Sequence, residues 1–460
     1  MNSLKNLGTK LKTAQIIALG FAGVIFVGAI LLYLPVSSAP GVHTTFIDAL
    51  FTATTSVCVT GLTTVSTAGS WSLFGKVVIL ILIQLGGFGI ITMSTIVLMV
   101  VGKRITLNDR NRIRESFNLD SMSGLARLIR KIVTGTLIVE AIGVVLYCFA
   151  FVPRFGAGKG IFVSVFNAVS SFCNAGMDIM GDTSLAEYAK SPLVNFTTMG
   201  LIVIGGLGYM VWWDLVGTGR RIVKKEIEWK KTWRYLNLNS KLVLSSTGIL
   251  IAGGTVLIFL FENHNPGTMG DFTTGQTWMA SLFQSVTCRT AGFFTIAQDK
   301  LREASVMVCM LLMFIGGSPM GTAGGVKTTT VWVLVLTAVT FLRGKKETEV
   351  FRRKVSDTYI RTALIVVLVS FSVLFISVVG ITLVSDAPFL DILYEMTSAV
   401  GTVGLSRGLT PNLSAAGKLI VILTMYIGRI GPVTLATAVT IQARRQTSNI
   451  HLPEEKILIG

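Results

Sequence analysis

Long apolar runs alternate along the chain with short basic segments. A helix that crosses a bilayer needs roughly 20 apolar residues. Seven runs reach about this length, and a glycine-rich segment interrupts an eighth. The runs are 14–34, 76–101, 132–152, 193–216, 242–261, 361–384 and 417–441, with the interrupted run at 304–342. This pattern predicts an all-α integral membrane protein with eight spans.

Between the two spans of each pair lies an apolar segment that is too short to cross a bilayer, followed by a short uncharged strand that ends in glycine. The first strand, Ser56–Leu62, reads S-V-C-V-T-G-L. The four equivalent glycines are separated by 115, 116 and 112 residues, and they are Gly61, Gly176, Gly292 and Gly404. We expect the short segments to be re-entrant helices at 48–55, 161–172, 275–287 and 389–399. Non-helical backbone at membrane depth is tolerated only where protein buries it or water lines it. Four copies therefore predict four repeats around a pseudo-fourfold ion pore.

These repeats divide the chain into four units. The first occupies 1–102, and the second occupies 103–220 and begins with a basic loop. The third occupies 221–343 and contains the interrupted span, and the fourth occupies 344–460 with the C-terminal tail.

Composition and charge support this interpretation. Hydrophobic residues make up 51% of the chain and charged residues only 14%, and the net charge is +17. Lys and Arg concentrate in 103–131, 220–241 and 343–361 and in both tails, which the positive-inside rule places in the cytoplasm. Orientation and contact with lipid headgroups is the simpler explanation of these loops, and docking of an acidic partner is the alternative. No separate basic domain suggests nucleic-acid binding. Five scattered cysteines without a C-x-x-C motif and three scattered histidines indicate neither a disulfide framework nor a zinc site.

The glycine strands carry the candidate binding chemistry. Backbone carbonyls can replace the water around a cation when extended strands turn them toward one axis. Glycine permits the positive φ that this geometry needs, and the C-termini of the short helices add partial negative charge at the axis. The residues three positions before the four glycines have unlike side chains. A common ring of carbonyls is therefore possible only if these side chains point away from the axis. The predicted filter residues are Val57, Cys58, Val59, Thr60, Gly61, Phe172, Cys173, Asn174, Ala175, Gly176, Cys288, Arg289, Thr290, Ala291, Gly292, Val400, Gly401, Thr402, Val403 and Gly404.

The second span of each repeat contains a further glycine cluster, which recurs at 86, 205, 316 and 428. Glycine often allows close helix packing in membranes, and this explains the first two clusters. The third is too rich in glycine and proline for a stable helix. We interpret it as an unwound intramembrane loop that obstructs the pore and moves; a helix break needed only for packing is the alternative. The predicted gate residues are Gly316, Gly317, Ser318, Gly321, Thr322, Ala323, Gly324, Gly325, Lys327 and Arg429.

Three charges fall within or beside the spans. Arg429 is expected to face a cavity, where it would repel cations or bridge to the loop carbonyls; the alternative is that it snorkels to the inner interface. Glu140 more readily fits a hydrogen bond to a neighbouring helix than an ion site. Asp214, beside Trp212 and Trp213, is expected at the interface.

Taken together, these motifs resemble the Trk/Ktr/HKT family of potassium-translocating subunits, and most of all its Ktr-type membrane subunit. The resemblance spans nearly the whole chain and rests on V-C-V-T-G-L, F-C-N-A-G, C-R-T-A-G-F-F-T, V-G-T-V-G-L-S, G-G-S-P-M-G-T-A-G-G-V-K-T-T-T and I-G-R-I-G-P. It implies four M1–P–M2 units, potassium uptake across the bacterial plasma membrane with sodium as a candidate modulator, and a homodimer. It also implies a separate cytosolic RCK-type nucleotide-binding ring as regulator and no covalently bound cofactor. The family's gating loop maps onto Gly316–Lys327, and its basic residue in the last span maps onto Arg429. Because family members with serine at the first of these glycines tend toward sodium, the resemblance implies that glycine at all four filter positions favours potassium.

Two other classes of function remain as alternatives. An ion-coupled secondary transporter would place its site at broken helices near the midplane, but such folds usually show two repeats, often inverted. A membrane enzyme would need a nucleophile–base pair or metal ligands, for which the scattered histidines provide no arrangement.

Overall fold

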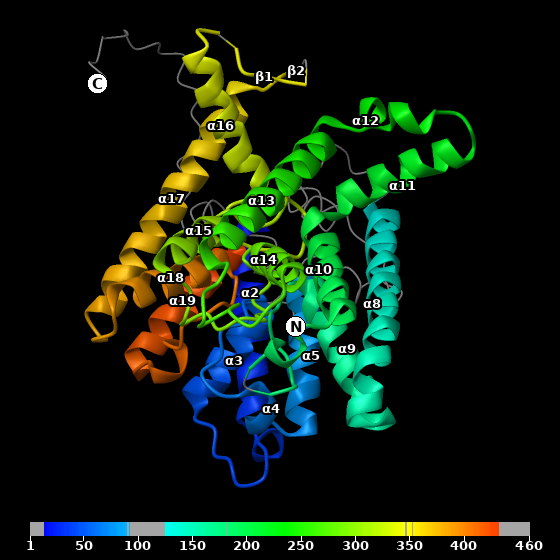
Figure 1. Cartoon of the computed structure of the whole chain (residues 1–460). Helices are drawn as coiled ribbons and strands as arrows, with labels where there is room; N and C mark the ends of the chain where they lie inside the picture. Colours follow the sequence, from blue (N-terminus) through cyan, green and yellow to red (C-terminus); the bar gives the residue numbers. More distant parts are fainter. Residues whose placement is uncertain are drawn as a thin grey trace, which may run out of the picture.

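The computed structural model describes residues 13–431 except 90–91, 93–124, 182, 346 and 352. The structure is a helical bundle in which short helices lie at the centre of longer ones (Figure 1). Both tails, Asp182 and most of the basic loop 103–131 lie outside the described residues. The fold is that of an all-α integral membrane protein.

Each repeat consists of a long first helix, a short pore helix and a second helix. The first helices are α2 (Thr13–Tyr33), α8 (Leu125–Phe155), α13 (Leu238–Glu262) and α17 (Asp357–Thr382). The pore helices are α3 (Phe46–Cys58), α9 (Ala157–Cys173), α14 (Thr274–Thr287) and α18 (Phe389–Gly401). The second helices are α5 (Leu73–Phe88), α10 (Pro192–Leu207) continued by α11 (Tyr209–Val223), α15 (Glu303–Phe314) continued by α16 (Thr328–Leu342), and α19 (Ala415–Ile430).

Short elements connect these helices. They are η1 (Pro35–Ser37), α4 (Thr67–Ser70), η2 (Ala186–Tyr188), η3 (Trp229–Lys231), α12 (Thr232–Tyr235), η4 (Thr410–Asn412) and a small antiparallel hairpin of β1 (Glu349–Val350) and β2 (Arg353–Lys354).

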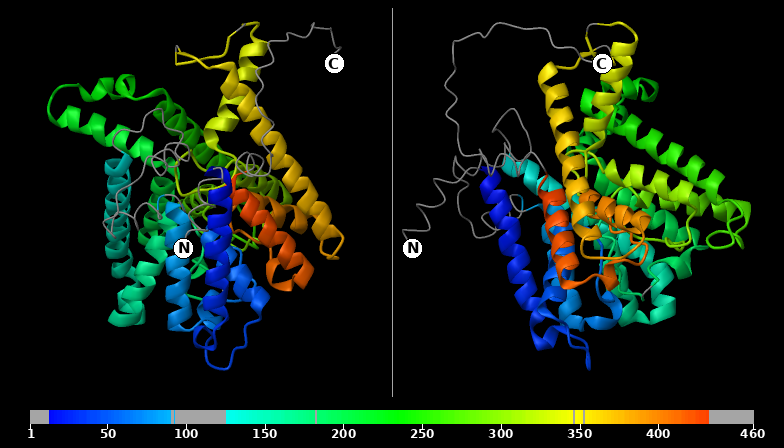
Figure 2. Two further views of the ribbon diagram at one scale, coloured as in Figure 1. Left: turned by 180° about the vertical axis from the view of Figure 1, so that it is seen from behind. Right: turned by 90° about the vertical axis from the view of Figure 1, so that its left-hand side faces the viewer.

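The repeats close into a ring. The second helix of each repeat packs on the pore helix of the next: α5 on α9, α10 on α14, α15 on α18 and α19 on α3. Figure 2 shows the consequence, since α2 and α19 lie side by side although they come from opposite ends of the described chain. The predicted pseudo-fourfold arrangement is therefore present.

The first and second helices differ in length. Four first-helix segments in the described residues are long and apolar enough to cross a membrane: Ala14–Tyr33, Arg127–Phe155, Leu238–Glu262 and Asp357–Thr382. The second helices are shorter, because three of them end at a glycine with positive φ: Gly89 at 78°, Gly208 at 89° and Gly431 at 89°. At Gly208 the chain bends by 99° between α10 and α11. The continuous span expected at 193–216 is therefore wrong. In the other two expected spans, α5 ends at Phe88 and α19 at Ile430, and the residues that follow are largely outside the described ones.

The pore helices extend further than the sequence predicted. The first was expected to end near Thr55 but continues to Cys58, and the second and fourth also continue through the third residue before their glycine. Val57, Cys58, Phe172, Cys173, Val400 and Gly401 thus belong to the last helical turn rather than to extended strands. Nothing in these apolar and small residues stops a helix, and the break comes only at a left-handed residue that follows.

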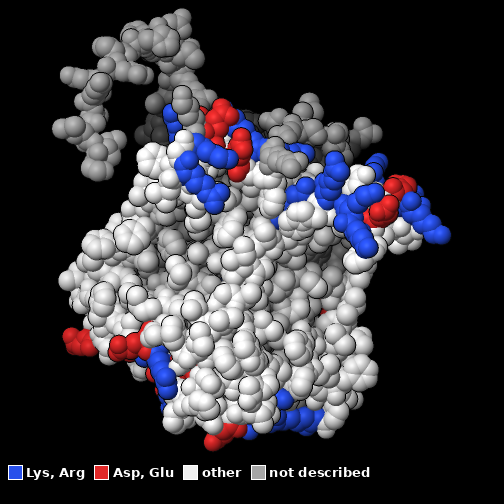
Figure 3. Space-filling model, turned by 45° about the horizontal axis from the view of Figure 1, so that its top comes forward, with Lys and Arg blue, Asp and Glu red and all other residues white. Residues whose placement is uncertain are grey.

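Charge divides the molecule into three zones. Lys and Arg gather at the end that carries β1, β2 and α12, and a band almost without charge separates them from a smaller charged set at the opposite end (Figure 3). Large apolar side chains such as Phe26, Phe149 and Phe375 are exposed on the first helices. The band matches the surface that a bilayer would cover.

Candidate functional site

The four glycine strands share one backbone conformation. Each glycine has positive φ: Gly61 at 101°, Gly176 at 63°, Gly292 at 84° and Gly404 at 96°. Two residues earlier, each strand has a non-glycine residue with positive φ: Val59 at 54°, Asn174 at 59°, Thr290 at 69° and Thr402 at 50°. A β-branched residue in the left-handed region is a genuine outlier and is kept only where its surroundings impose it. Val59, Thr290 and Thr402 are such outliers, and Asn174, a residue type that tolerates this region, has the same conformation at the same position, so the four strands form one repeated structure.

The four glycines form a closed ring. A Cβ atom placed on each glycine would collide with the carbonyl oxygen that precedes the glycine of a neighbouring repeat. The distances are 2.7 Å from Gly61 to Ala175, 2.5 Å from Gly176 to Ala291, 2.4 Å from Gly292 to Val403 and 2.2 Å from Gly404 to Thr60. The four strands therefore meet at one point with no room for side chains. The positive φ that the sequence predicted for these glycines is present, and the close approach of the strands is a second reason for glycine at these positions.

Hydroxyl groups at the ends of the pore helices hold the strands. Thr55 Oγ1 accepts from the amide of Gly61 at 2.9 Å, and Ser398 Oγ accepts from the amide of Gly404 at 3.0 Å. In the second repeat Ser170 Oγ accepts from the amide of Met177 at 3.1 Å and donates to its carbonyl at 2.6 Å. These three residues each lie six positions before the glycine of their strand, a register that could have revealed them in the sequence.

Two of the side chains three positions before a ring glycine, those of Arg289 and Cys173, have contacts behind the strands. Arg289 is 8% exposed, and its Nη2 donates to Thr247 Oγ1 of α13 at 3.5 Å. A Cβ atom on Gly87 of α5 would lie 2.4 Å from Cys173 Sγ, so this thiol packs against a helix. Both contacts agree with the prediction that unlike side chains turn away from the axis.

The second glycine clusters contact the last turns of the pore helices from outside. A Cβ atom on Gly86 would lie 2.1 Å from the Val57 carbonyl oxygen. A Cβ atom on Gly205 would lie 2.0 Å from that of Phe172, and one on Gly428 would lie 2.4 Å from that of Val400. Each of these carbonyls is four residues before a ring glycine. These glycines therefore allow more than general helix packing. They let the second helix of a repeat contact the C-terminal end of the pore helix, directly before the glycine strand.

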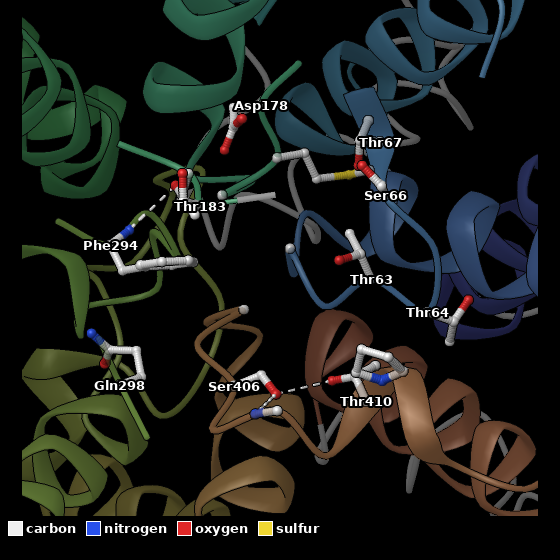
Figure 4. A pocket seen from close by; sticks show the side chains of 18 of the residues that line it. Thr63, Thr64, Ser66, Thr67, Asp178, Thr183, Phe294, Gln298, Ser406 and Thr410 are labelled. Atoms are coloured by element: carbon white, nitrogen blue, oxygen red, sulfur yellow. Dashed lines mark hydrogen bonds between the residues drawn. The ribbon is translucent and has the colours of Figure 1, made fainter. Parts of the chain in front are cut away.

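A vestibule of about 640 Å³ opens above the ring, and the four ring glycines contribute to its lining. Polar side chains from all four repeats surround it, including Thr63, Asp178, Gln298 and Ser406 (Figure 4). The vestibule therefore gives an ion a polar route to the glycine ring.

Buried polar side chains support the vestibule wall in the third and fourth repeats. Gln298 exchanges hydrogen bonds with Gln284 and accepts one from the Tyr394 hydroxyl at 3.0 Å. The fully buried carboxylate of Glu395 accepts from Ser406 Oγ at 2.7 Å and from the Thr410 hydroxyl. No sequence pattern indicates this support, because only the fold brings these loops beside the pore helices.

Residues 315–327 run as an irregular loop on the other side of the ring. The amide of Gly316 donates to the Val326 carbonyl at 2.9 Å, which closes the loop at its base. Ser318 and Thr322 donate from their amides to Gly206 and Gly205 at 2.9 and 3.1 Å. The predicted unwound segment is therefore present, and it packs against the break between α10 and α11.

The loop also contacts a pore helix and the last span. Thr322 Oγ1 donates to the carbonyl of Phe172 at 3.0 Å. The Arg429 guanidinium donates to the carbonyl of Thr322 and to that of Gly86, and Lys327 Nζ donates to the carbonyl of Ala323 at 2.7 Å. Arg429 thus bridges the loop and α5, as one of the two cavity hypotheses predicted, and it does not snorkel.

Glu140 makes the hydrogen bond to a neighbouring helix that was expected, whereas the interfacial position of Asp214 stays a prediction. Glu140 is 5% exposed, and its Oε1 accepts from Gln84 Nε2 of α5 at 3.1 Å, a contact between neighbouring helices. Asp214 accepts two hydrogen bonds from Asn237, one from the backbone amide and one from the side chain, both at 2.9 Å. These contacts fit structural roles.

Comparison with known proteins shows which of them this chain resembles. The family described as TrkH, cation transport protein, matches residues 13–449. The Ktr system potassium uptake protein B of Vibrio alginolyticus is 39% identical over 446 residues, which cover 97% of this chain and 94% of the relative. The potassium/sodium uptake protein NtpJ of Enterococcus hirae is 38% identical and covers 99% of both chains. The crystal structure of the potassium transporter TrkH from Vibrio parahaemolyticus has a TM-score of 0.73 at 16% identity, over 93% of this chain and 84% of that one.

Proposed function

Because this chain belongs to the TrkH family of cation transport proteins, we propose that it is the pore subunit of a potassium uptake system. Membership in a transport family argues against the membrane enzyme considered from the sequence. The similarity to Ktr system potassium uptake proteins supports potassium as the transported ion. The name of the Enterococcus hirae relative includes sodium, which supports retaining sodium as a modulator or second cargo. The proposal includes no covalently bound cofactor.

The closed glycine ring is the observation that carries this proposal. A cation that enters the ring must lose water, and backbone carbonyls can replace that water without adding net charge. Four pore helices end at the ring, so the partial negative charge of their C-termini favours a cation there. The collisions that a Cβ atom would make at each glycine show how closely the carbonyl-bearing strands approach.

The loop at 315–327 is the proposed gate. It lies below the ring and is held by three kinds of hydrogen bond. The amides of Ser318 and Thr322 donate to carbonyls of α10, Arg429 of the last span donates to the carbonyl of Thr322, and Lys327 donates to the carbonyl of Ala323 within the loop. Arg429 and Lys327 also place positive charge beside the path of a cation. Opening would require the loop to exchange these hydrogen bonds for others.

The distribution of charge supports an orientation. The end that carries the basic segments would face the cytoplasm, and the vestibule would face outward. Both termini would then be cytoplasmic, and the protein would lie in the bacterial cell membrane. A homodimer and a separate cytosolic RCK-type ring remain proposals that rest on the family resemblance.

The test is ion flux through the purified protein in liposomes, with rubidium or potassium compared with sodium. We expect passive rubidium and potassium flux that exceeds sodium flux and follows the electrochemical gradient. Deletion of Gly321–Gly324 is expected to raise the flux, because it shortens the obstructing loop. A fixed stoichiometry between two ions would instead indicate coupled symport. Equal or lower flux from a folded deletion variant would contradict the gate.

A further inference from the structure

A basic arm leaves the helical body at the bend below the glycine ring. We define the surface arm as residues 209–237, which comprise α11, η3, α12 and their connections. Because α11 turns by 99° from α10, it runs across the direction of the spans and projects from the end that carries the basic segments (Figure 1). The surface arm is therefore placed at the level where a bilayer would end.

Apolar and basic side chains are mixed on the surface arm. Val223, Trp229, Trp233 and Tyr235 are 83%, 72%, 45% and 46% exposed. Seven Lys or Arg residues accompany them: Arg220, Arg221, Lys224, Lys225, Lys230, Lys231 and Arg234. Indole rings and basic side chains together are typical of segments that lie in the headgroup region of anionic membranes.

Internal ion pairs neutralise only part of this charge. Glu226 contacts Arg221 at 3.4 Å, and Glu228 contacts Lys231 at 3.2 Å. Within the described part of the chain, no ion pair involves Lys224, Lys225 or Lys230. An acidic soluble protein would match these charges but would leave the exposed Trp229 and Val223 without an apolar neighbour. A lipid interface satisfies both, because it offers phosphate oxygens beside acyl chains.

The base of the surface arm is joined to the loop at 315–327. The amide of Tyr209 donates to the carbonyl of Met320 at 3.1 Å, and a Cβ atom on Gly208 would lie 2.3 Å from the Pro319 carbonyl oxygen. Trp212 fixes the bend, since its Nε1 donates to the carbonyl of Ile204 at 2.7 Å. A force on α11 would therefore act directly on the middle of the loop.

We propose that the surface arm binds anionic phospholipid headgroups and that this binding holds the loop at 315–327 in its closed position. The lipid contact stands on the exposure and charge of the arm alone. The effect on the loop rests on the proposed function, because it assumes that the loop is a gate.

Lipid contact can be measured without any transport assay. An environment-sensitive NBD group on a Val223→Cys variant would report the position of the arm in vesicles that contain spin-labelled phospholipid. We expect strong quenching in mixed phosphatidylcholine and phosphatidylglycerol vesicles, weak quenching in phosphatidylcholine alone, and loss of the difference at high salt. The same labelling of protein without this substitution corrects for reaction at Cys148, the only native cysteine in the described residues that is not buried.

Matched variants assign the effect to the arm. Added Lys230→Gln and Lys231→Gln substitutions should abolish the extra quenching by phosphatidylglycerol. Arg343→Gln with Lys345→Gln removes the same charge at the end of α16 and should leave the quenching unchanged. Equal quenching in both lipid mixtures, or an unchanged Lys230→Gln/Lys231→Gln variant, would overturn the lipid contact. Shielding of the dye only when an acidic soluble protein is added would also overturn the lipid contact, and it would indicate a protein partner.

Rubidium flux in the same vesicles tests the coupling. Phosphatidylglycerol should lower the flux of the unmodified protein by about fivefold, the lower end of ordinary coupling between two sites. The Lys230→Gln/Lys231→Gln variant should show no such effect. Lipid-dependent quenching with lipid-independent flux would overturn the coupling and leave the lipid contact standing. Quenching with no cation flux under any condition would instead count against the proposed function.

Discussion

A Cβ atom on Gly404 would lie 2.2 Å from the carbonyl oxygen of Thr60. These residues come from the last and first repeats, and their contact closes the ring of strands on the repeat that opened it. The ring therefore depends on every repeat, and a defect in one glycine should disturb a carbonyl that belongs to another repeat.

Gly404→Ala should strongly reduce conduction. The new methyl group would meet the Thr60 carbonyl, and the positive φ of 96° adds strain. Backbone strain of about 1–2 kcal/mol would alone cost roughly a tenfold loss of the conducting conformation, and the collision with the Thr60 carbonyl should make the loss larger. Rubidium flux per inserted protein measures this loss. Gly408→Ala provides a control, because Gly408 also has φ of 96° but a Cβ atom there meets no atom within 4 Å. Equal loss in both variants would show that strain, and not the ring contact, is responsible.

Gly205→Ala should impair the second strand from behind. A Cβ atom at this position would lie 2.0 Å from the Phe172 carbonyl oxygen. The backbone of α10 cannot move away easily at Gly205, because the amide of the loop residue Thr322 donates to the Gly205 carbonyl. Gly200→Ala on the same helix has open space and should be neutral or slightly stabilising. We expect the thermal unfolding midpoint and the flux to fall in the first variant alone. Indistinguishable variants would contradict the proposed support of the strand by this glycine.

Arg429→Lys should raise the flux. The guanidinium reaches carbonyls of two elements, Thr322 in the loop and Gly86 in α5, whereas an ammonium group cannot reproduce this planar bridge. Loss of one charge-assisted hydrogen bond of roughly 1.5–3 kcal/mol would increase the open fraction by about tenfold or more. Flux in liposomes measures the change, with a monodisperse elution profile as the control for folding. Reduced flux would show that Arg429 serves conduction and not closure.

The Asp48–Lys418 ion pair should stabilise the protein in a pH-dependent way. Asp48 lies in the first turn of α3 and contacts Lys418 of α19 at 2.7 Å. Burial alone would raise the pKa of this carboxyl, but hydrogen bonds from Lys418 and Thr45 prevail and hold its pKa below the ordinary 3.8. The stabilisation is therefore complete above pH 3.8 and is lost as the pH falls through the lower pKa of the folded state.

Asp48→Asn tests this pair. Its thermal unfolding midpoint in detergent should be lower than that of the unmodified protein by roughly 1–3 °C at neutral pH. The difference should disappear below the pKa of the folded state. In a Lys418→Met background the substitution should have a smaller effect at neutral pH, because the partner is absent. A difference that persists unchanged at low pH would assign the effect to something other than the charge of Asp48.

The repeats and the positions of the ring glycines could be predicted from the sequence, because spacing and apolar length survive without knowledge of contacts. The left-handed conformation of Val59 and Thr290 could not, since local preference opposes it and only the assembled ring imposes it. The ends of the pore helices were also missed, because Val57 and Cys58 are compatible with either helix or strand. The partners of Glu395 and Arg429 lie in other loops or repeats, so no local pattern records them.

The most direct test of the central claim is the ratio of potassium flux to sodium flux in liposomes for the unmodified protein and for Gly61→Ser. Gly61 has the most space of the four ring glycines, with 2.7 Å between an added Cβ atom and the Ala175 carbonyl oxygen, so this variant has the best prospect of remaining folded. If the ring selects the ion, the ratio should exceed one in the unmodified protein and fall in the variant. An unchanged ratio in a folded Gly61→Ser protein would contradict the assignment of the four strands as the selectivity filter.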